Sequence, residues 1–336
     1  MSKSVLISGI GGFIGSHLLE HLLINTDWNI IGIDSFRHKG ITDRITDTLV
    51  YNRFPDRVKI ITHDLIAPIS PLMIETIGGP IDYIINMASE SHVDRSIVHP
   101  VPFIKNNVDL VLTMLEYARI IKPKVFIQIS TDEVYGPMNK GDPHPEWDTI
   151  LPSNPYSASK AAQEAIAISY WRTYSVPIVI TNTMNNYGER QDPEKYLPKV
   201  IRSVLTDSMV TVHGTPTDIG SRFWLHARNH ADALLYLLQT ITPKMFPNFH
   251  KPDRFNVVGD KQINNLEMAQ LVASVIGKPL NYTLEDYHST RPGHDPHYGL
   301  DGDLLKMWGW KPPIDLESSL EKTVLWYEAN PRWLKL

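Results

Sequence analysis

The segment Ser4-Val5-Leu6-Ile7-Ser8-Gly9-Ile10-Gly11-Gly12-Phe13-Ile14-Gly15 decides the fold. A short apolar run leads into a glycine-rich turn, and apolar residues with helical spacing then continue through residues 13–23, so the segment predicts a strand, a turn and a helix. Glycine permits the tight turn and lets the backbone approach a pyrophosphate, whose charge the helix N-terminus favours. We therefore expect a dinucleotide-binding turn made by Gly9, Gly12, Phe13, Ile14 and Gly15.

The next two strand-like runs supply acidic residues that suit a dinucleotide. Residues 28–34 end in Asp34, a position suited to holding ribose hydroxyls, which favours NAD over NADP. Arg37 lies close enough in sequence to meet a 2′-phosphate, so NADP stays open. Asp64 and Leu65 follow the third run, and we expect them to contact the adenine.

The rest of the first half repeats the alternation of apolar runs and amphipathic patterns. Further strands are predicted at residues 58–63, 83–87, 125–130 and 178–183, and helices at residues 107–121 and 156–174. Strands of a parallel sheet are buried on both faces and are therefore continuously apolar, as here. We predict an α/β fold with a Rossmann-type, doubly wound parallel sheet, whose fourth strand leads to Ala88 at the cofactor.

Prolines and glycines become frequent after residue 184, which indicates a smaller and less regular C-terminal α/β lobe. We predict an NAD-binding domain over residues 1–184, to which roughly residues 222–255 return, including a helix at 230–240. Residues 185–336 would form the second lobe, which covers the end of the sheet.

The composition excludes several functional classes. The net charge is −5 and no basic run is present, which argues against a nucleic-acid surface. No apolar stretch approaches the roughly 20 residues of a membrane helix. The chain has no cysteine, which excludes disulfides, thiol catalysis and cysteine–zinc sites. Its histidines show no metal-binding motif, so we expect no metal, and we expect a soluble cytoplasmic enzyme.

Tyr156 and Lys160 are four residues apart on a predicted helix and therefore lie on one face. A free phenol has a pKa of about 10, but a neighbouring ammonium and a positive nicotinamide both favour the phenolate. Tyr156 is thus a candidate general base that removes a hydroxyl proton while hydride leaves the same carbon. The pattern alone is common by chance, and its position well after a dinucleotide turn makes it informative.

The triplet Thr131-Asp132-Glu133 follows the strand predicted at residues 125–130. Ligands of doubly wound sheets bind beyond the carboxyl ends of the strands, so two adjacent carboxylates there suggest chemistry beyond hydride transfer. Neighbours on a strand point to opposite faces. If both carboxylates act on one substrate, the chain must leave strand geometry at this point.

Together these motifs resemble the extended short-chain dehydrogenase/reductase superfamily, and within it the nucleoside-diphosphate-glucose 4,6-dehydratases that act on dTDP-glucose or UDP-glucose. The resemblance covers nearly the whole chain. It is carried by Glu90-Ser91-His92-Val93-Asp94-Arg95-Ser96, the Thr131-Asp132-Glu133 triplet, Tyr156 to Lys160, Asn185-Asn186-Tyr187-Gly188, Pro193-Glu194-Lys195 and Arg291-Pro292-Gly293-His294-Asp295.

The resemblance implies a role for each catalytic residue. Tyr156, with Thr131 nearby, takes the proton of the sugar 4-hydroxyl as hydride passes from C4 to NAD. Glu133 removes the C5 proton, protonated Asp132 donates to the departing C6 hydroxyl, and the hydride returns to C6. Opposed roles for adjacent carboxyls require one raised pKa and one that is not raised. The product is an NDP-4-keto-6-deoxyglucose for deoxysugar synthesis of the rhamnose type.

The resemblance also implies a nucleotide-sugar site in the second lobe and a homodimer formed through the helices at residues 107–121 and 156–174. The residues expected to contact the substrate are Ser91, Val93, Asn185, Glu194, Lys195, Arg222, Asn256 and Arg291. Phe223 and Ala227-Arg228-Asn229 depart from the usual Asp and Val-Glu-Asp, which leaves uracil and thymine equally open. A nucleotide-sugar 4-epimerase, a uronate decarboxylase and a non-catalytic NAD-sensing protein are the alternatives, and the Asp-Glu pair argues against the first two.

Overall fold

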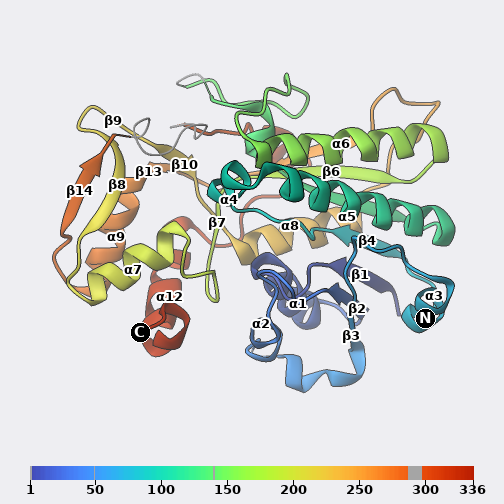
Figure 1. Cartoon of the computed structure of the whole chain (residues 1–336), viewed down its shortest axis with the longest axis horizontal. Coiled ribbons are helices and arrows are strands. Elements are labelled where there is room, and N and C mark those ends of the chain that lie inside the picture. The colour runs from blue at the N-terminus through green and yellow to red at the C-terminus, as the bar shows by residue number, and fades with distance from the viewer. Residues whose placement is uncertain (1, 49, 139–140, 287–296) are drawn as a thin grey trace.

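A parallel sheet forms the centre of the computed structural model, which describes residues 2–48, 50–138, 141–286 and 297–336. Seven strands lie in the order β12-β6-β5-β4-β1-β2-β3, and every neighbouring pair is parallel (Figure 1). The strands are β1 (Ser4–Ser8), β2 (Asn29–Asp34), β3 (Val58–Thr62), β4 (Tyr83–Asn86), β5 (Val125–Thr131), β6 (Ile178–Thr183) and β12 (Asp253–Val257). The strand order reverses between β1 and β4, so the predicted doubly wound sheet is confirmed.

Side-chain alternation along the strands gives the sheet two apolar faces. On β1, Val5 and Ile7 enter one core cluster, and Leu6 between them enters the other. On β5, Phe126 and Ile127 divide between the two clusters in the same way. Since all of these side chains are fully buried, both faces of the sheet must be covered by helices.

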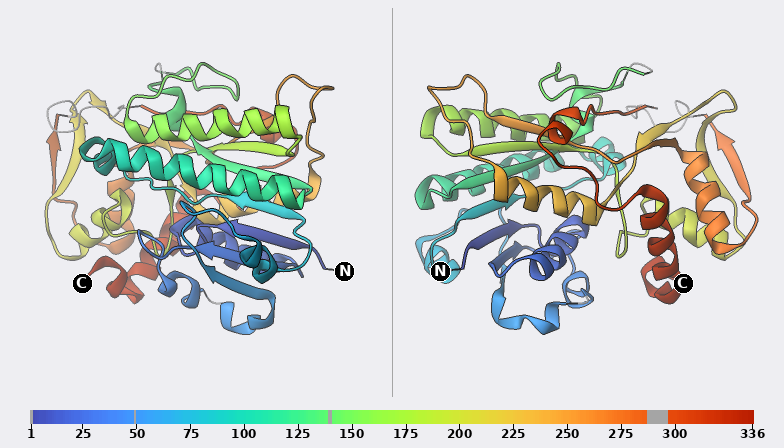
Figure 2. Two further views of the ribbon diagram at one scale, coloured as in Figure 1. Left: turned by 45° about the vertical axis from the view of Figure 1, so that its right-hand side comes forward. Right: turned by 180° about the vertical axis from the view of Figure 1, so that it is seen from behind.

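Helices cover both faces of the sheet (Figures 1 and 2). One core cluster contains residues of α1 (Phe13–Asn25), α8 (Ala227–Thr240) and α11 (Asp303–Met307). The other contains residues of α3 (Pro71–Ile77), α5 (Pro100–Ile121) and α6 (Pro155–Tyr174), and α5 and α6 pack side by side. Short segments at the carboxyl edge and in the loops are α2 (Thr42–Thr46), α4 (Val93–Val98), η1 (Tyr51–Arg53), η2 (Pro55–Arg57) and η3 (Asp132–Tyr135).

The C-terminal part packs around a core of its own, at the left of Figure 1. Its helices are α7 (Tyr196–Leu205), α9 (Asn265–Ile276) and α12 (Leu316–Ala329), followed by η4 (Pro331–Leu334). Its strands pair in small groups: β14 (Tyr282–Glu285) with β8 (Val210–Thr215) and β9 (Asp218–Ile219), β10 (Ser221–Phe223) with β13 (Gln262–Asn264), and β7 (Asn186–Tyr187) with β11 (Leu225–His226). Strands of two or three residues, such as β7, β9, β10, β11 and β13, are too short to carry a periodic signal in the sequence.

The chain crosses between the two parts several times. Helix α8 packs against α1 and strand β12 pairs with β6, whereas β10 pairs with β13 in the C-terminal part. Leu305 and Trp310, near the C-terminus, lie in the core of the first part. The predicted boundary at residue 184, with roughly residues 222–255 returning to the first domain, stays a prediction; α8 and β12 pack on the first part, and so do Leu305 and Trp310, which that prediction did not include.

A buried ion pair joins the edge strand β12 to α6. Arg254 donates to Glu164 over 2.7 Å, and the two side chains are 1% and 0% exposed. Arg254 also donates to the Tyr135 hydroxyl over 2.9 Å, and Glu164 accepts from Asn182 over 2.8 Å. These contacts connect β12 and β6 with α6 and η3 behind the site described below.

Replacing Glu164 with alanine should therefore destabilise the protein strongly, because it leaves Arg254 charged and buried without its carboxylate. We expect the free energy of unfolding, measured by urea titration, to fall by about 3–5 kcal/mol. The control is Glu317→Ala, which breaks the exposed Lys261–Glu317 pair and should cost no more than about 1 kcal/mol. Equal losses in both variants would contradict this account of the Glu164 contacts.

Candidate active site

A cleft of about 370 Å³ opens at the carboxyl ends of the central strands. It is lined by residues that follow β1, β2, β3, β4, β5 and β6, and by residues of the C-terminal part. Most of the predicted site residues line it: Gly9, Gly12, Phe13, Ile14, Gly15, Asp34, Asp64, Leu65, Ala88, Ser91, Thr131, Asp132, Glu133, Tyr156, Lys160, Asn185, Glu194 and Lys195.

The glycine turn has the geometry that a bound pyrophosphate needs. Gly9 has φ +77°, a backbone conformation that suits glycine. A Cβ on Gly15 would stand 2.2 Å from the Gly9 carbonyl oxygen, so only glycine allows the turn to close on α1. Helix α1 has no acidic residue in its first turn and no side-chain cap, so its N-terminal N–H groups are not capped by its own side chains.

Asp34 and Asp64 lie beside this turn. The Asp34 carboxylate accepts from the backbone N–H of Gly11 and of Phe36, each over 2.9 Å, and burial raises its pKa. Arg37 forms an ion pair with Asp64 over 2.9 Å. Arg37, the cation that could meet the 2′-phosphate of NADP, is therefore paired with a carboxylate. Asp34, a second carboxylate, lies at the position predicted to hold the ribose. The two carboxylates together disfavour a 2′-phosphate.

The chain leaves strand geometry within the triplet Thr131-Asp132-Glu133, as expected if both carboxyls act on one substrate. Strand β5 ends at Thr131, and residues 132–135 form the 3₁₀ turn η3. The Thr131 hydroxyl donates to Asp132 over 2.8 Å and accepts from the Glu133 N–H over 3.4 Å. Asp132 is 3% exposed, and Glu133 is partly buried on the cleft wall. Both carboxyl groups thus face the same cleft.

Burial raises the pKa of both carboxyls. It brings the pKa of Asp132 to about 6 and, together with the charge of Asp132, that of Glu133 to about 7. Contacts with Thr131, Asn154 and the Arg222 guanidinium work in the opposite direction. Both pKa values thus shift in the same direction, because two adjacent buried carboxyls share one poorly solvated environment.

Tyr156 and Lys160 line the cleft but do not form the pair that the sequence suggested. The Lys160 ammonium donates to the Ile129 carbonyl over 2.7 Å and to Gln163 over 2.6 Å, and burial lowers its pKa to about 8. Burial and the charges of Glu133 and Asp132 raise the pKa of Tyr156 far above its usual range. The expected lowering of the phenol pKa by Lys160 is therefore not seen, because other acceptors hold the ammonium.

Asn154 contacts the site but was not among the residues predicted from the sequence. Its side-chain oxygen accepts from the Ser157 N–H over 3.0 Å and caps α6, the helix that carries Tyr156. Its side-chain nitrogen donates to Glu133 over 3.2 Å. In the sequence, an asparagine before Pro155 indicates only a helix cap. Its contact with Glu133 depends on how η3 lies against α6.

The residues predicted to contact the substrate lie at different places relative to the cleft. Lys195 donates to the Ser91 carbonyl over 3.3 Å, and Val93 begins α4 beside the lining residues without being one of them. Arg222 stands on β10 with its guanidinium 5.0 Å from the Tyr298 ring, and its charge lowers the pKa of both Asp132 and Glu133. Arg222 is thus near Asp132 and Glu133 and is not a lining residue.

Asn256 does not lie where the sequence analysis expected a substrate contact. It is fully buried on β12, outside the cleft, and its amide donates to the carbonyls of His144 and Asp301 over 3.0 and 2.9 Å. Its amide satisfies buried backbone carbonyls, a task for which an asparagine is as well suited as for binding a nucleoside. Arg291 lies outside the described residues.

Charged residues that the sequence did not single out bridge the two sides of the cleft. Lys39, in the loop after β2, forms ion pairs with Asp192 over 2.9 Å and with Glu194 over 3.1 Å. Glu194 also contacts Arg95 over 3.2 Å and His92 over 3.3 Å. The loop after β2 and the segment after β7 are thereby connected across the opening. Side chains so distant in sequence gave no signal of meeting.

Within the described ranges, no group of three or more His, Asp and Glu side chains is arranged to hold a metal ion. The described helices likewise include none that is long and apolar enough to cross a membrane.

A family model described as GDP-mannose 4,6 dehydratase matches residues 6–323. The chain belongs to this family. It is 32% identical to dTDP-glucose 4,6-dehydratase 1 of Escherichia coli K12 over 98% of this chain and 94% of that protein. It is 33% identical to the low-salt glycan biosynthesis protein Agl12 of Haloferax volcanii, over 96% of this chain and 98% of the relative. The recognition of a dehydratase from its motifs is therefore confirmed.

Solved structures agree with this family. The dTDP-glucose 4,6-dehydratase DesIV of Streptomyces venezuelae, crystallised with NAD, superposes with a TM-score of 0.84 at 28% identity over 98% of each chain. The dTDP-glucose 4,6-dehydratase of Bacillus anthracis, also in complex with NAD, has a TM-score of 0.84 at 27% identity over 99% of each chain. The Rossmann-type fold class is confirmed over the full length.

Replacing Asn154 with serine should separate its two contacts. Serine still caps α6, but its shorter side chain places no donor where the Asn154 amide nitrogen lies, and losing that donor raises the pKa of Glu133 further. If Glu133 is the base that removes the C5 proton, the rise of turnover with pH should move to higher pH. The pH–rate profile measures this shift.

Asn264→Ser is the matched control, because Asn264 also caps a helix, α9, through a capping box and does not line the cleft. Its pH profile should equal that of the unchanged protein. A profile that stays in place in Asn154→Ser would show that the contact with Glu133 does not set its protonation.

Proposed function

We propose that this protein is an NAD-dependent dTDP-glucose 4,6-dehydratase, a hydro-lyase that makes dTDP-4-keto-6-deoxyglucose. The observation that carries the proposal is the meeting of Asp132, Glu133 and Tyr156 in one cleft beside the glycine turn. A dehydrogenase or an epimerase needs a group that exchanges the 4-hydroxyl proton. Loss of water from C5 and C6 also needs a carbon base and an acid for the leaving hydroxyl, and the two carboxyls supply these.

NAD as the cofactor is confirmed at the level of the family by solved relatives that contain it. The chain's own residues fit the group: Gly9 and Gly15 let the turn close on α1, whose first turn carries no acidic residue or side-chain cap, and Asp34 lines the cleft at the end of β2. When bound, NAD accepts hydride from C4 and returns it to C6, and its positive charge favours an ionised phenol nearby. Asp64, Leu65 and Ala88 would border the rest of the cofactor.

The chain's side chains then divide the proton transfers. Tyr156 takes the 4-hydroxyl proton as the C4–H bond breaks, which makes the 4-ketone. The ketone acidifies the C5 hydrogen, and Glu133 removes that proton. Asp132 donates a proton to the C6 hydroxyl, which leaves as water while the C5–C6 double bond forms. Glu133 returns its proton to C5 as the hydride would add to C6, and the proton held by Tyr156 replaces the one that Asp132 gave to the leaving water, so the net change is the loss of one water.

The nucleotide is proposed from the relatives and not from the pocket. The E. coli and B. anthracis relatives are both named as dTDP-glucose enzymes. Uracil and thymine differ by a methyl group, which a pocket distinguishes by only about 1–3 kcal/mol. UDP-glucose is therefore the comparison substrate in every assay. Asn185, Glu194, Lys195, Arg222 and Arg291 are proposed to hold the diphosphate and sugar, with Ser91 and Val93 beside them.

The double variant Asp132→Asn/Glu133→Gln tests the proposed chemistry. It should keep its NAD and lose formation of the 4-keto-6-deoxy product, because neither amide can remove the C5 proton or protonate the leaving hydroxyl. Purified protein is assayed with dTDP-glucose and UDP-glucose side by side, without added NAD, and the product is detected by its absorbance in alkali.

Retained product in the double variant would overturn the assignment of Asp132 and Glu133. A C4-epimerised or decarboxylated product from the unchanged protein would instead favour an epimerase or a decarboxylase. Failure to convert either nucleotide sugar, with NAD bound, would favour a non-catalytic NAD-binding protein.

We also propose that the protein is a homodimer formed through α5 and α6. The outward side of α5 carries Ile104, Val108 and Leu112 at helical spacing, all partly or largely exposed. The neighbouring side of α6 presents the small residues Ala162 and Ala165. Two such helix pairs would bury these faces in a four-helix contact.

Leu112→Arg should convert the dimer to a monomer, because it puts a charge in the middle of this contact. Sedimentation equilibrium at micromolar concentration measures the mass. Leu72→Arg on α3 is the control, since Leu72 is 71% exposed away from both helices and should leave the mass unchanged. A monomeric mass for the unchanged protein would contradict the proposal.

A further inference from the structure

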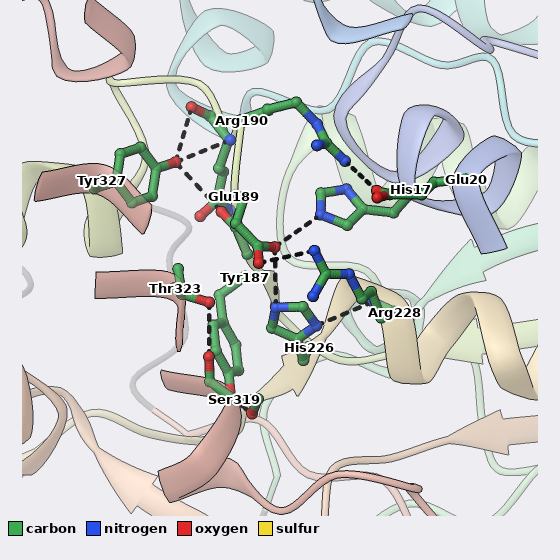
Figure 3. Close-up of polar contacts among 12 residues, drawn as sticks. His17, Glu20, Tyr187, Glu189, Arg190, His226, Arg228, Ser319, Thr323 and Tyr327 are labelled. Carbon is green, nitrogen blue, oxygen red and sulfur yellow. Dashed lines mark hydrogen bonds and ion pairs between the residues drawn. The ribbon is translucent and has the colours of Figure 1, made fainter. Parts of the chain in front are cut away.

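A cluster of buried charges lies behind the proposed substrate segment, which we define as residues 185–195 (Figure 3). Both ends of the segment line the cleft, through Asn185 and Asn186 at one end and Gln191, Asp192, Glu194 and Lys195 at the other. Glu189 and Arg190 lie between these ends, do not line the cleft and are 2% and 1% exposed. The proposed chemistry uses neither of these two side chains.

Glu189 connects the segment to two helices of the first part. One carboxylate oxygen contacts His17 on α1 over 3.2 Å and His226 over 3.4 Å, and the other contacts Arg228 on α8 over 3.0 Å. Burial alone would raise the pKa of Glu189, but the contacts with His17 and His226 outweigh it and hold the pKa well below the usual range. The group is therefore a buried carboxylate whose stability depends on these partners.

Arg190 makes a second connection to the same helix. Its guanidinium pairs with Glu20 on α1 over 2.8 Å, and both side chains are at least 96% buried. Its carbonyl accepts from Arg44 over 2.8 Å. Its backbone has φ +63°, a left-handed conformation that a non-glycine residue keeps only where the surrounding contacts hold it.

The remaining contacts close the segment on its other side. The Tyr327 hydroxyl on α12 accepts from the Gln191 N–H over 2.9 Å. A Cβ on Gly188 would stand 3.1 Å from the ring of His226 and 3.3 Å from that of His17, so the chain passes close to both imidazoles. The segment is thus fixed between α1, α8 and α12, with its two ends left to line the cleft (Figure 3).

We propose that Glu189 and Arg190 are positioning residues that dock the substrate segment onto α1, the helix that begins at the cofactor turn. His17 is one helical turn after Phe13, and Glu20 is almost one turn further. The same helix therefore presents its N-terminus to the cofactor and two side chains to the segment that holds the nucleotide sugar. This inference rests on the proposed function, since it assumes that residues 185–195 bind the substrate.

Glu189→Gln tests the docking in the purified protein with its bound NAD. Glutamine keeps the shape of the side chain but removes the carboxylate that contacts His17 on α1 and Arg228 on α8, so the segment should loosen from both helices. We expect the KM for dTDP-glucose to rise at least tenfold, kcat to fall less than threefold, and the NAD content per chain to stay unchanged. Binding of dTDP alone, followed by calorimetry, should weaken by a similar factor.

Two further variants keep the test independent of folding. Arg228 is 31% exposed, so Arg228→Gln is tolerated more easily and should raise the KM by a smaller factor. Because Glu189 and Arg228 act together, the double variant should equal Glu189→Gln alone instead of adding the two effects. Glu317→Gln, which breaks an exposed pair far from the cleft, is the control and should leave KM and dTDP binding unchanged.

The outcomes separate the two proposals. Variants that lose thermal stability but keep the KM and dTDP affinity of the unchanged protein would overturn the positioning role. Loss of NAD together with substrate affinity would also overturn it, because the cluster would then hold the cofactor turn itself. If the unchanged protein neither converts dTDP-glucose nor binds dTDP, the proposed function is wrong, whatever the variants show.

Discussion

Burial of two adjacent carboxyls at the end of β5 is the constraint on which the rest of the site depends. Poor solvation raises the pKa of both Asp132 and Glu133 towards neutrality, where a carboxyl can give a proton as well as take one. The surroundings limit that rise through Thr131, Asn154 and Arg222. The pKa of each carboxyl therefore depends on low solvation, which raises it, and on nearby groups from different elements of the fold, which lower it.

The sequence predicted the central sheet well because its strands are buried on both faces. The runs at Ser4–Ser8 and Ile178–Thr183 agree with β1 and β6 at both ends. Helix α5 begins at Pro100 and not at residue 107, since proline fits the first helical turn although it reads as a helix breaker. The strands of the C-terminal part are two to six residues long, and apart from the β8–β9 hairpin they pair with partners far along the chain.

The site was predictable wherever a side chain directly follows a parallel strand, because the carboxyl ends of such strands meet at one edge. Asn154, Lys39 and Glu189 were not predictable, since each matters only through a partner from a distant segment. Asn256 shows the opposite failure. Its chemistry suits a nucleoside, but buried backbone carbonyls compete for the same amide, and only the packing of β12 decides between them.

Burial raises the pKa of both Asp132 and Glu133 towards neutral pH, so the division of roles between them depends on what each carboxyl contacts. Asp132 accepts from the Thr131 hydroxyl, and Glu133 accepts from the Asn154 amide. The Asn154 donor and the charge of Lys195 both favour the ionised form of Glu133, which its proposed role as base requires. Lys195 belongs to the segment that Glu189 and Arg190 are proposed to dock on α1, so one segment carries proposed substrate contacts and a positive charge near Glu133.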